Sequence, residues 1–277
     1  MSEPLVTVER QGPTASLILN RPDKRNAINQ AVLDDLNWAI ASVRDDPAAR
    51  VVVLRGRGPV FSSGIDHNLL LETFQRSQAA PFRHLHGDIH AVLNALAHME
   101  KPVIAVLHGT AVGMALELAL AADFRIARAD CIVGLPEVAF GIIPDVGGTT
   151  RLTRLVGASR AKEMILTGEL FTAARAESIG LVNRAVANDE ALEAAVTSLA
   201  SALARHPPAA VGLGKALIDR VQEVDDATAL RLEGVYQSIL LQRPDVGEHF
   251  ASALGFIQSE LKRARGLPGG GGSGGGY

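Results

Sequence analysis

The sequence predicts an α/β fold followed by a helical C-terminal region. Two short, continuous apolar runs, residues 51–54 and 102–107, are typical of strands that are buried on both faces. Segments with helical periodicity alternate with these runs, which favours an α/β layout. From residue 147 onward the pattern is helical almost throughout. The 277 residues and 47% hydrophobic content suffice for one large core with an appendage.

The N-terminal elements are predicted in order along the chain. Residues 5–9 and 14–20 are β-rich runs, and the Gly-Pro turn between them indicates a hairpin. Residues 30–41 have the spacing of an amphipathic helix, and Asn29 is placed to cap its start.

The later elements divide the chain into three regions. Residues 67–98 are predicted to be helical, and short strands are expected at 124–127 and 131–134. Further helices are expected at 149–155, 160–166, 173–178, 189–205, 208–221, 226–241 and 246–264, with a short run at 181–186. We therefore predict a core at 1–200, a helical region at 201–266 and a tail at 267–277. The tail has the Gly-rich composition of a flexible linker or added tag.

Composition and charge exclude several classes of protein. A net charge of −3 and an aromatic content of 4% do not fit a nucleic-acid binder. No apolar run reaches the roughly 18 residues of a membrane-spanning helix, and the first residues lack the pattern of a secretory signal. The single cysteine, Cys131, fits a reducing compartment. We expect a soluble, cytoplasmic protein without nucleic-acid or membrane partners.

Two common chemistries have only weak signals. Gly56 and Gly58 follow a strand, but Phe61 occupies the place of the third glycine of a dinucleotide-binding loop. Ser62 and Ser63 lack the Gly-x-Ser-x-Gly context of a hydrolase nucleophile.

A histidine cluster has two interpretations. His86 and His90 are four residues apart and share a helix face, as two metal ligands would, with His84 and Asp88 beside them. The surrounding segment is polar, and no second cluster of ligands is evident. A solvated helix face is therefore favoured, and no metal site is expected.

Residues 108–148 carry the strongest functional signal. A strand ends at Gly109 and an apolar helix begins near Met114, so the first amides of that helix lack internal acceptors and carry the positive end of its dipole. Small neighbouring residues let a ligand approach, and the tight turn at 62–65 can supply a second amide. Two such donors can stabilise a developing oxyanion.

Three acids lie on the apolar, tightly turned segments of this stretch: Glu117, Glu137 and Asp145. A carboxylate in an apolar setting indicates a function. Each acid also has a structural alternative, because Glu117 can complement the helix dipole, Glu137 can be a solvated loop acid, and Asp145 can cap the next helix. Two facing carboxylates tend to share a proton, so they can act as acid and base and deliver a water across a double bond.

From about residue 5 to residue 266, the chain resembles the crotonase, or enoyl-CoA hydratase/isomerase, superfamily. The resemblance rests on motifs in the family's order: Asn20-Arg21-Pro22, Asn26-Ala27, Phe61 to Asp66, Gly109 to Glu117 and on to Asp123, Pro136-Glu137 to Gly148, Thr167-Gly168-Glu169, and Ala176 to Val182. It implies a crotonase-like spiral of ββα units, a C-terminal helical trimerisation region, and homotrimers or hexamers built as dimers of trimers. It also implies an acyl-CoA thioester substrate and no separate cofactor, because coenzyme A is part of that substrate.

The resemblance also assigns site residues by position. The backbone amides of Ile65 and Met114 fall on the oxyanion hole, Glu117 and Glu137 fall on the two catalytic glutamates, and Asp145 is a third candidate. The predicted substrate or coenzyme A contacts are Arg25, Ala27, Ser63, Asp66, His67 and Asn68.

The chain departs from the hydratase pattern at several positions. Met114 and Ala115 replace the usual glycines, which keeps the amide but narrows the pocket. Asp145 stands where most hydratases have a small residue, and dienoyl-CoA isomerases use an acid there to move protons. Those isomerases usually have Asp in place of Glu117. Lys262 is the candidate for a basic contact to the coenzyme A phosphate.

The preferred prediction is an enoyl-CoA hydratase that adds water reversibly to a trans-2-enoyl-CoA through a stabilised thioester enolate. The first alternative is an enoyl-CoA or dienoyl-CoA double-bond isomerase that uses Glu137 and Asp145. The second is a non-catalytic crotonase-fold binding protein, which would have little use for two such glutamates.

Overall fold

A computed structural model describes residues 3–75 and 79–265. The chain divides into two compact units, Met1–Gly212 and Leu213–Tyr277, and the division falls within helix α8 (Pro208–Val221). The predicted boundary after residue 200 stays a prediction. The predicted tail at 267–277 lies outside the described residues.

A six-stranded sheet runs through unit 1 in the order β1-β2-β3-β4-β6-β9. Its strands are β1 (Val6–Gln11), β2 (Thr14–Leu19), β3 (Val51–Gly56), β4 (Val103–Leu107), β6 (Phe124–Arg128) and β9 (Arg184–Val186). The first two strands form the predicted antiparallel hairpin, and all the other neighbours are parallel.

A smaller sheet gives the chain its spiral course. It contains β5 (Thr110–Val112), β7 (Ile132–Gly134) and β8 (Phe171–Thr172). After β4 and again after β6 of the large sheet, the chain adds a strand to the small sheet and then enters a helix. This order is seen in β4-β5-α4, with α4 at Met114–Leu120, and again in β6-β7 followed by α5 (Gly148–Thr167).

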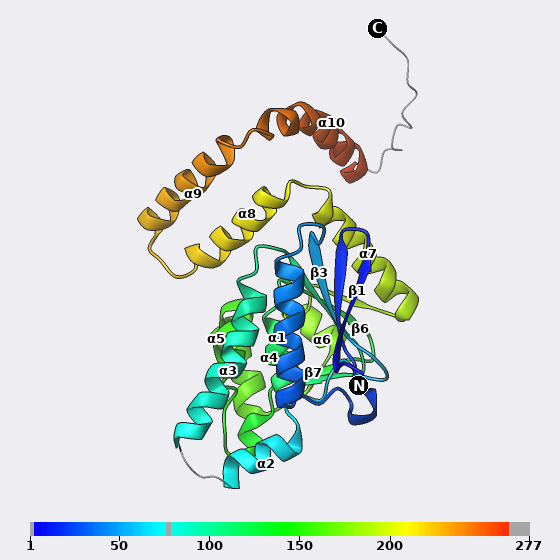
Figure 1. Ribbon diagram of the computed structural model, residues 1–277, viewed down its shortest axis with the longest axis vertical. Coiled ribbons are helices and arrows are strands. Elements are labelled where there is room, and N and C mark those ends of the chain that lie inside the picture. The colour runs from blue at the N-terminus through cyan, green and yellow to red at the C-terminus, as the bar shows by residue number, and fades with distance from the viewer. Residues whose placement is uncertain (1–2, 76–78, 266–277) are drawn as a thin grey trace. The chain divides into compact units, whose positions relative to one another are not determined.

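Helices cover both faces of the large sheet (Figure 1). Val52 and Leu54 of β3 join a core cluster with α1 (Gln30–Arg44) and α3 (Ala79–Ala97), whereas Val51 and Val53 join a second cluster with α7 (Asp189–Ala204). Successive strand residues point to opposite faces, so the apolar side chains of β3 contribute to the hydrophobic core on each face of the sheet. The prediction of a strand buried on both faces is confirmed.

Some predicted elements differ in detail. The helical stretch at 67–98 is two helices, α2 (His67–Gln75) and α3, with undescribed residues between them. The two helices predicted within 149–166 are both present in α5, where the non-helical backbone of Gly157 (φ 79°, ψ 160°) separates them. The short run predicted at 181–186 ends in strand β9. The predicted cap is confirmed, because the side chain of Asn29 accepts from the amide of Val32.

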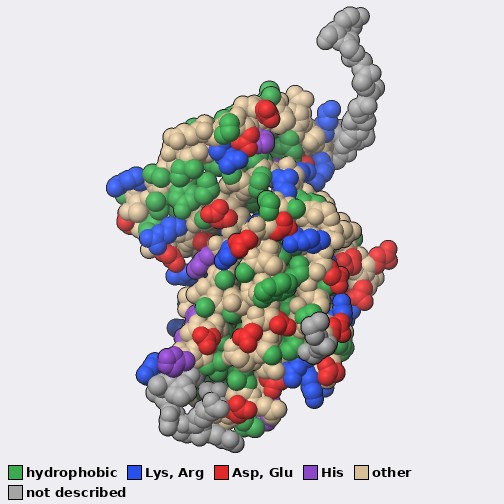
Figure 2. Space-filling view, viewed as in Figure 1, with side chains coloured by type: hydrophobic (Ala, Val, Ile, Leu, Met, Phe, Trp, Pro, Cys, Tyr) green, Lys and Arg blue, Asp and Glu red, His purple; other side chains and the backbone are tan. Residues whose placement is uncertain are grey.

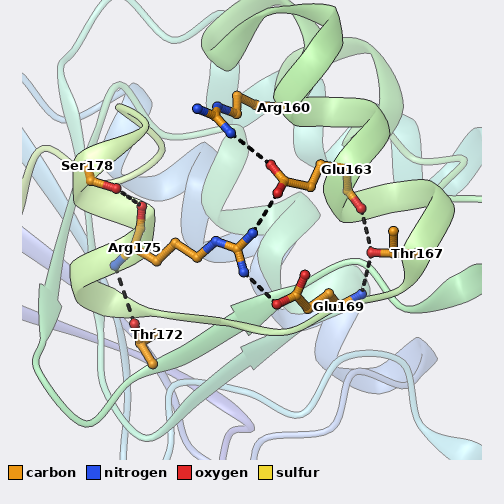
Figure 3. Close-up of polar contacts among 7 residues, drawn as sticks. All are labelled: Arg160, Glu163, Thr167, Glu169, Thr172, Arg175 and Ser178. Carbon is orange, nitrogen blue, oxygen red and sulfur yellow. Dashed lines mark hydrogen bonds and ion pairs between the residues drawn. The ribbon is translucent and has the colours of Figure 1, made fainter.

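An ion-pair network joins the end of α5 to β8 and α6 (Ala173–Ser178), as Figure 3 shows. Arg175 is at its centre, with Nη2 2.7 Å from Glu163 Oε1, Nη1 bonded to Glu169, and its guanidinium 3.7 Å above the ring of Phe171. Gly168, beside this network, packs against Val138 of the short 3₁₀ helix η2 (Glu137–Phe140). The network therefore lies next to the segment that carries Glu137, one of the predicted acids.

Unit 2 continues α8 into α9 (Asp226–Leu241) and α10 (Val246–Ala264), whose bounds match the prediction. No residue described in α9 or α10 is buried. Their exposed apolar side chains, some visible in Figure 2, include Leu230, Val235, Ile239, Leu241, Phe250, Leu254, Ile257 and Leu261. Among the described helices of the whole chain, none has the length and hydropathy that crossing a bilayer requires.

Candidate active site

Two main-chain turns meet at the N-terminus of α4. The helix begins at Met114, as predicted, directly after Gly113 (φ 59°). Gly64, in the turn at 62–65, packs against this start: a Cβ atom placed on Gly64 would lie 2.6 Å from the carbonyl oxygen of Val112 and 3.4 Å from the amide nitrogen of Met114. Only glycine fits such an approach, and the φ of Gly64 is also positive at 90°.

The amides of Ile65 and Met114 are both available as donors. Within the described part of the chain, neither donates to an acceptor. Ile65 forms an isolated β-bridge with Ile28, but the hydrogen bonds of this bridge are made by the residues on either side of Ile65. Ile28 N donates to Gly64 O (2.8 Å), and Asp66 N donates to Ile28 O (2.8 Å). Met114 is the first residue of a helix and has no internal acceptor. The two predicted donors are thus placed on adjacent segments and left unsatisfied, as an oxyanion hole requires.

Glu117 is held in the first turn of α4 with only 2% of its surface exposed. Its Oε1 accepts hydrogen bonds from the amides of Val146 (3.0 Å) and Gly148 (2.8 Å). The pKa of the Glu117 carboxyl is raised to about 8, chiefly by burial and also by the charges of Glu137 and Asp145, while the hydrogen bonds from the two amides oppose the rise. This carboxyl therefore titrates near neutral pH.

Glu137 approaches the same helix start from η2. Its Oε1 lies 3.2 Å from the position a Cβ would take on Gly113, the residue before Met114. Its Oε2 is buried and has no hydrogen-bond partner among the residues that the structure describes. Burial, and secondarily the charge of Asp145, raises the pKa of Glu137 to about 7. This placement contradicts the alternative of a solvated loop acid.

Asp145 does not cap α5. The helix begins at Gly148 after Gly147, which provides no side-chain cap. The amide of Gly148, which a cap at position 145 would use, already donates to Glu117. The capping alternative is therefore wrong, and the Asp145 side chain, 38% exposed, stays beside the two glutamates.

His86 and His90 contact the loop that contains Asp145. Their Nε2 atoms lie 2.9 Å and 3.0 Å from the backbone carbonyl oxygen of Asp145, and their ring centroids are 4.4 Å apart. Both side chains are partly buried, so the prediction of a solvated helix face is wrong at these two positions. No group of three His, Cys, Asp or Glu side chains among the described residues is arranged to hold a metal ion.

The predicted coenzyme A contacts lie on two segments that hydrogen bonds join. Ser62 Oγ donates to Asn26 O (2.8 Å), and Ser63 N donates to Arg25 O (3.0 Å). Asp66 pairs with Arg21 at 2.5 Å, which lowers the pKa of the Asp66 carboxyl. The residues exposed on these segments are Arg25, Ser63, His67 and Asn68, and those partly buried are Ala27 and Asp66. Their roles as contacts stay predictions.

Two buried polar side chains that support the site were not predicted. Asn26, 1% exposed, ties the two segments together, because its Nδ2 donates to the carbonyl of Phe61 (3.0 Å) among others. Arg125, 3% exposed, donates to the carbonyl of Ala122 (2.7 Å), which lies just after α4, and to the carbonyl of Leu181 (2.8 Å). Burial lowers the pKa of Arg125 to about 10, so it remains a cation at neutral pH. Its signal in the sequence is an arginine inside an apolar strand.

Known proteins share both the sequence and the fold. The chain matches the model of the enoyl-CoA hydratase/isomerase family over residues 9–248. It is 39% identical over 225 residues to enoyl-CoA hydratase domain-containing protein 2, mitochondrial, of Bos taurus (80% of this chain and 75% of the relative). It is 37% identical over 254 residues to 2,3-dehydroadipyl-CoA hydratase of Escherichia coli (92% and 96%). A crystal structure of an enoyl-CoA hydratase from Thermoplasma volcanium superposes with a TM-score of 0.84 at 31% identity (90% and 97%). The predicted α/β fold class with C-terminal helices is confirmed, and the trimerisation expected of those helices stays a prediction.

Proposed function

Since the chain belongs to the enoyl-CoA hydratase/isomerase family, we propose that it is an enoyl-CoA hydratase that adds water reversibly across the double bond of a trans-2-enoyl-CoA. Relatives that carry hydratase names, at 36–39% identity, support this reaction. The observation on which the proposal rests is a pair of acids, the buried Glu117 and the half-buried Glu137, beside the amides of Ile65 and Met114, which donate to no acceptor among the described residues.

The amides act on the thioester carbonyl. When water adds at C3, negative charge moves onto this oxygen to give an enolate. Hydrogen bonds from Ile65 and Met114, together with the positive end of the α4 dipole, stabilise that charge. These donors are preorganised, because the bridge to Ile28 and the helix start fix their direction before substrate binds.

The glutamates act on the water. With pKa values of about 8 and about 7, the pair Glu117–Glu137 holds one proton between pH 7 and pH 8. Because Glu117 has the higher pKa, the shared proton is mainly on Glu117, and the reacting arrangement is the less populated one, in which Glu137 holds the proton and Glu117 is ionised. From this arrangement, the water oxygen bonds to C3 while one water proton passes to the Glu117 carboxylate, and the proton on Glu137 passes to C2. The proton then returns from Glu117 to Glu137, which restores the starting state. Coenzyme A enters only as part of the substrate, so this scheme needs no metal or separate cofactor.

The test is a panel of 2-enoyl, 3-enoyl and 3,5-dienoyl thioesters with the product followed by mass. Hydration predicts that the 2-enoyl substrates gain the mass of one water and lose their conjugated ultraviolet absorbance. Turnover without a change in mass would contradict it, and no turnover of any thioester would support a binding protein.

A double-bond isomerase is the second candidate, since the charge of Asp145 is near enough to Glu137 to raise its pKa. In that reaction Glu137 and Asp145 would each move one proton. Asp145→Asn would then abolish turnover of 3-enoyl thioesters. Under the hydratase proposal, this variant retains hydration within about tenfold of the parent, because Asp145 modulates the pair without holding the water.

Assembly and location are further proposals. The exposed apolar surface of α9 and α10 supports a homotrimer or a hexamer, in which such side chains would be buried. Light scattering on the purified protein tests this state. The cytoplasmic location stays a prediction, because the relatives include proteins named mitochondrial.

A further inference from the structure

Side chains of helix α3 bind the loop before α5, and a backbone amide of that loop binds Glu117. His86 and His90, one turn apart on α3, both place Nε2 within 3.0 Å of the carbonyl oxygen of Asp145. A carbonyl can only accept, so each ring must carry a hydrogen on Nε2. Two donors on one carbonyl fix the orientation of that peptide group.

One turn further along α3, Asn94 is connected to the same loop through Arg151 of α5. Asn94 Oδ1 accepts from Arg151 Nη2 (2.7 Å), and Arg151 Nη1 donates to the carbonyl of Val146 (3.2 Å). At the start of the loop, Thr149 Oγ1 donates to the carbonyl of Pro144 (2.7 Å). Three successive carbonyls of the loop are therefore bound by side chains.

The histidines and the glutamate bind opposite ends of one peptide group. The carbonyl of Asp145 and the amide of Val146 belong to the same planar unit, and that amide donates to Glu117 Oε1 at 3.0 Å. A rotation of this plane that breaks the histidine bonds also turns the amide away from the carboxylate. Hydrogen bonds in such a chain also strengthen one another.

The Glu117 carboxylate depends on this support. It is 2% exposed, and the acids facing it are Glu137 from η2 and Asp145 from the loop, which both oppose its ionisation. The groups that favour its ionisation are the two loop amides, which donate hydrogen bonds to it, and the positive charge of Arg151 on α5. A loop that shifted would leave a buried charge without its direct hydrogen bonds.

We propose that His86 and His90 are positioning residues for Glu117, and that they act through the peptide group between Asp145 and Val146. The kinetic part of this inference rests on the proposed hydratase function. The structural part, the coupling of the two rings to the charge of Glu117, does not.

The kinetic test replaces both rings. In His86→Ala/His90→Ala, kcat for hydration is expected to fall about tenfold, the effect of one lost hydrogen bond, with KM changed less than about twofold. The limb of the pH profile set by Glu117 is expected to move up by about one pH unit. His86→Gln/His90→Gln, which keeps an amide donor at each position, is expected to restore most of the rate. His84→Ala, an exposed histidine of the same helix, is the matched control and should leave all three quantities unchanged.

A second test needs no activity. Glu117→Gln removes the titrating group, so the difference in unfolding free energy between the parent and the Glu117→Gln variant, followed from about pH 5 to about pH 11, reports the ionisation of Glu117. In the double alanine background this difference is expected to level off about one pH unit higher than in the parent background. Each single alanine variant, which keeps one ring on the carbonyl, is expected to give a smaller shift in the same direction.

The two tests separate the two proposals. A pH dependence that is identical in the parent and in the histidine variants would overturn the positioning role, whatever the enzyme's substrate. A parent protein that hydrates no enoyl thioester would overturn the proposed function, and the stability cycle would still decide the role of the histidines.

Discussion

Replacing Glu117 by Gln is expected to remove most of the activity while making the protein more stable at alkaline pH. The substitution is nearly isosteric, and the amide oxygen of Gln can still accept from Val146 and Gly148, so the loop should keep its position. The neutral side chain cannot take a proton from water, and loss of a positioned base lowers kcat by about 10²–10⁴-fold.

The gain in stability follows from the pKa of the buried acid. Folding moves the Glu117 pKa from 4.5 to about 8, and at about 1.4 kcal/mol per pKa unit the folded state opposes ionisation by about 5 kcal/mol. Between pH 4.5 and pH 8, the unfolded chain has released this proton and the folded chain has kept it. The parent therefore loses stability as pH rises through this window, and Gln, which does not titrate, escapes the loss.

Urea unfolding at pH 5, 7 and 9 measures this difference directly. The two proteins should have similar unfolding free energies at pH 5, and the variant should exceed the parent by an amount that approaches about 5 kcal/mol at pH 9. Glu190→Gln, an exposed glutamate in the first turn of α7, controls for loss of one negative charge. A constant difference at all three pH values would refute the burial argument, and full hydration by the variant would refute the catalytic assignment.

Three further substitutions test other parts of the site. Glu137→Gln should lower kcat by about 10²–10⁴-fold, measured as loss of conjugated absorbance, with the circular dichroism spectrum unchanged. Gly148→Ala would place a Cβ 2.7 Å from Glu117 Oε1, so it should reduce turnover and destabilise the fold by about 1–3 kcal/mol, whereas Gly87→Ala, with no atom within 4 Å of its Cβ, should be neutral or stabilising in the same urea assay. Arg125→Met leaves several buried carbonyls without a donor and should cost about 3 kcal/mol; unchanged stability would contradict the support assigned to Arg125.

The long elements could be predicted because their information is local. The three C-terminal helices match their predicted bounds, and the cap at Asn29 is present. Helical periodicity and capping depend on residues three or four positions apart, so both can be recognised in a short stretch of sequence. The strands β5 and β8, with three residues and two, have no such pattern. They exist because β7 lies between them and supplies partners from elsewhere in the chain.

The site was predictable where its parts share one segment. The start of α4 at Met114 and the position of Glu117 in its first turn follow from small residues that run into an apolar helix. The contacts of His86 and His90 could not be found in this way, because their acceptor is a backbone carbonyl 59 and 55 residues away. The alternative that Asp145 caps α5 is wrong for a similar reason, since the amide of Gly148 donates instead to Glu117, 31 residues away.

Helix α4 connects a buried arginine to the proposed oxyanion hole. The helix has seven residues, all buried, and one so short gains little stability from its own hydrogen bonds. Its N-terminus presents the amide of Met114, and near its C-terminus Arg125 donates to Ala122 O at 2.7 Å and lies 3.4 Å from Ala119 O. A buried cation at that end complements the negative end of the dipole, as the proposed enolate oxygen complements the positive end. Arg125 therefore stabilises the helix whose first amide is the proposed oxyanion donor, and it does so from the opposite end of that helix.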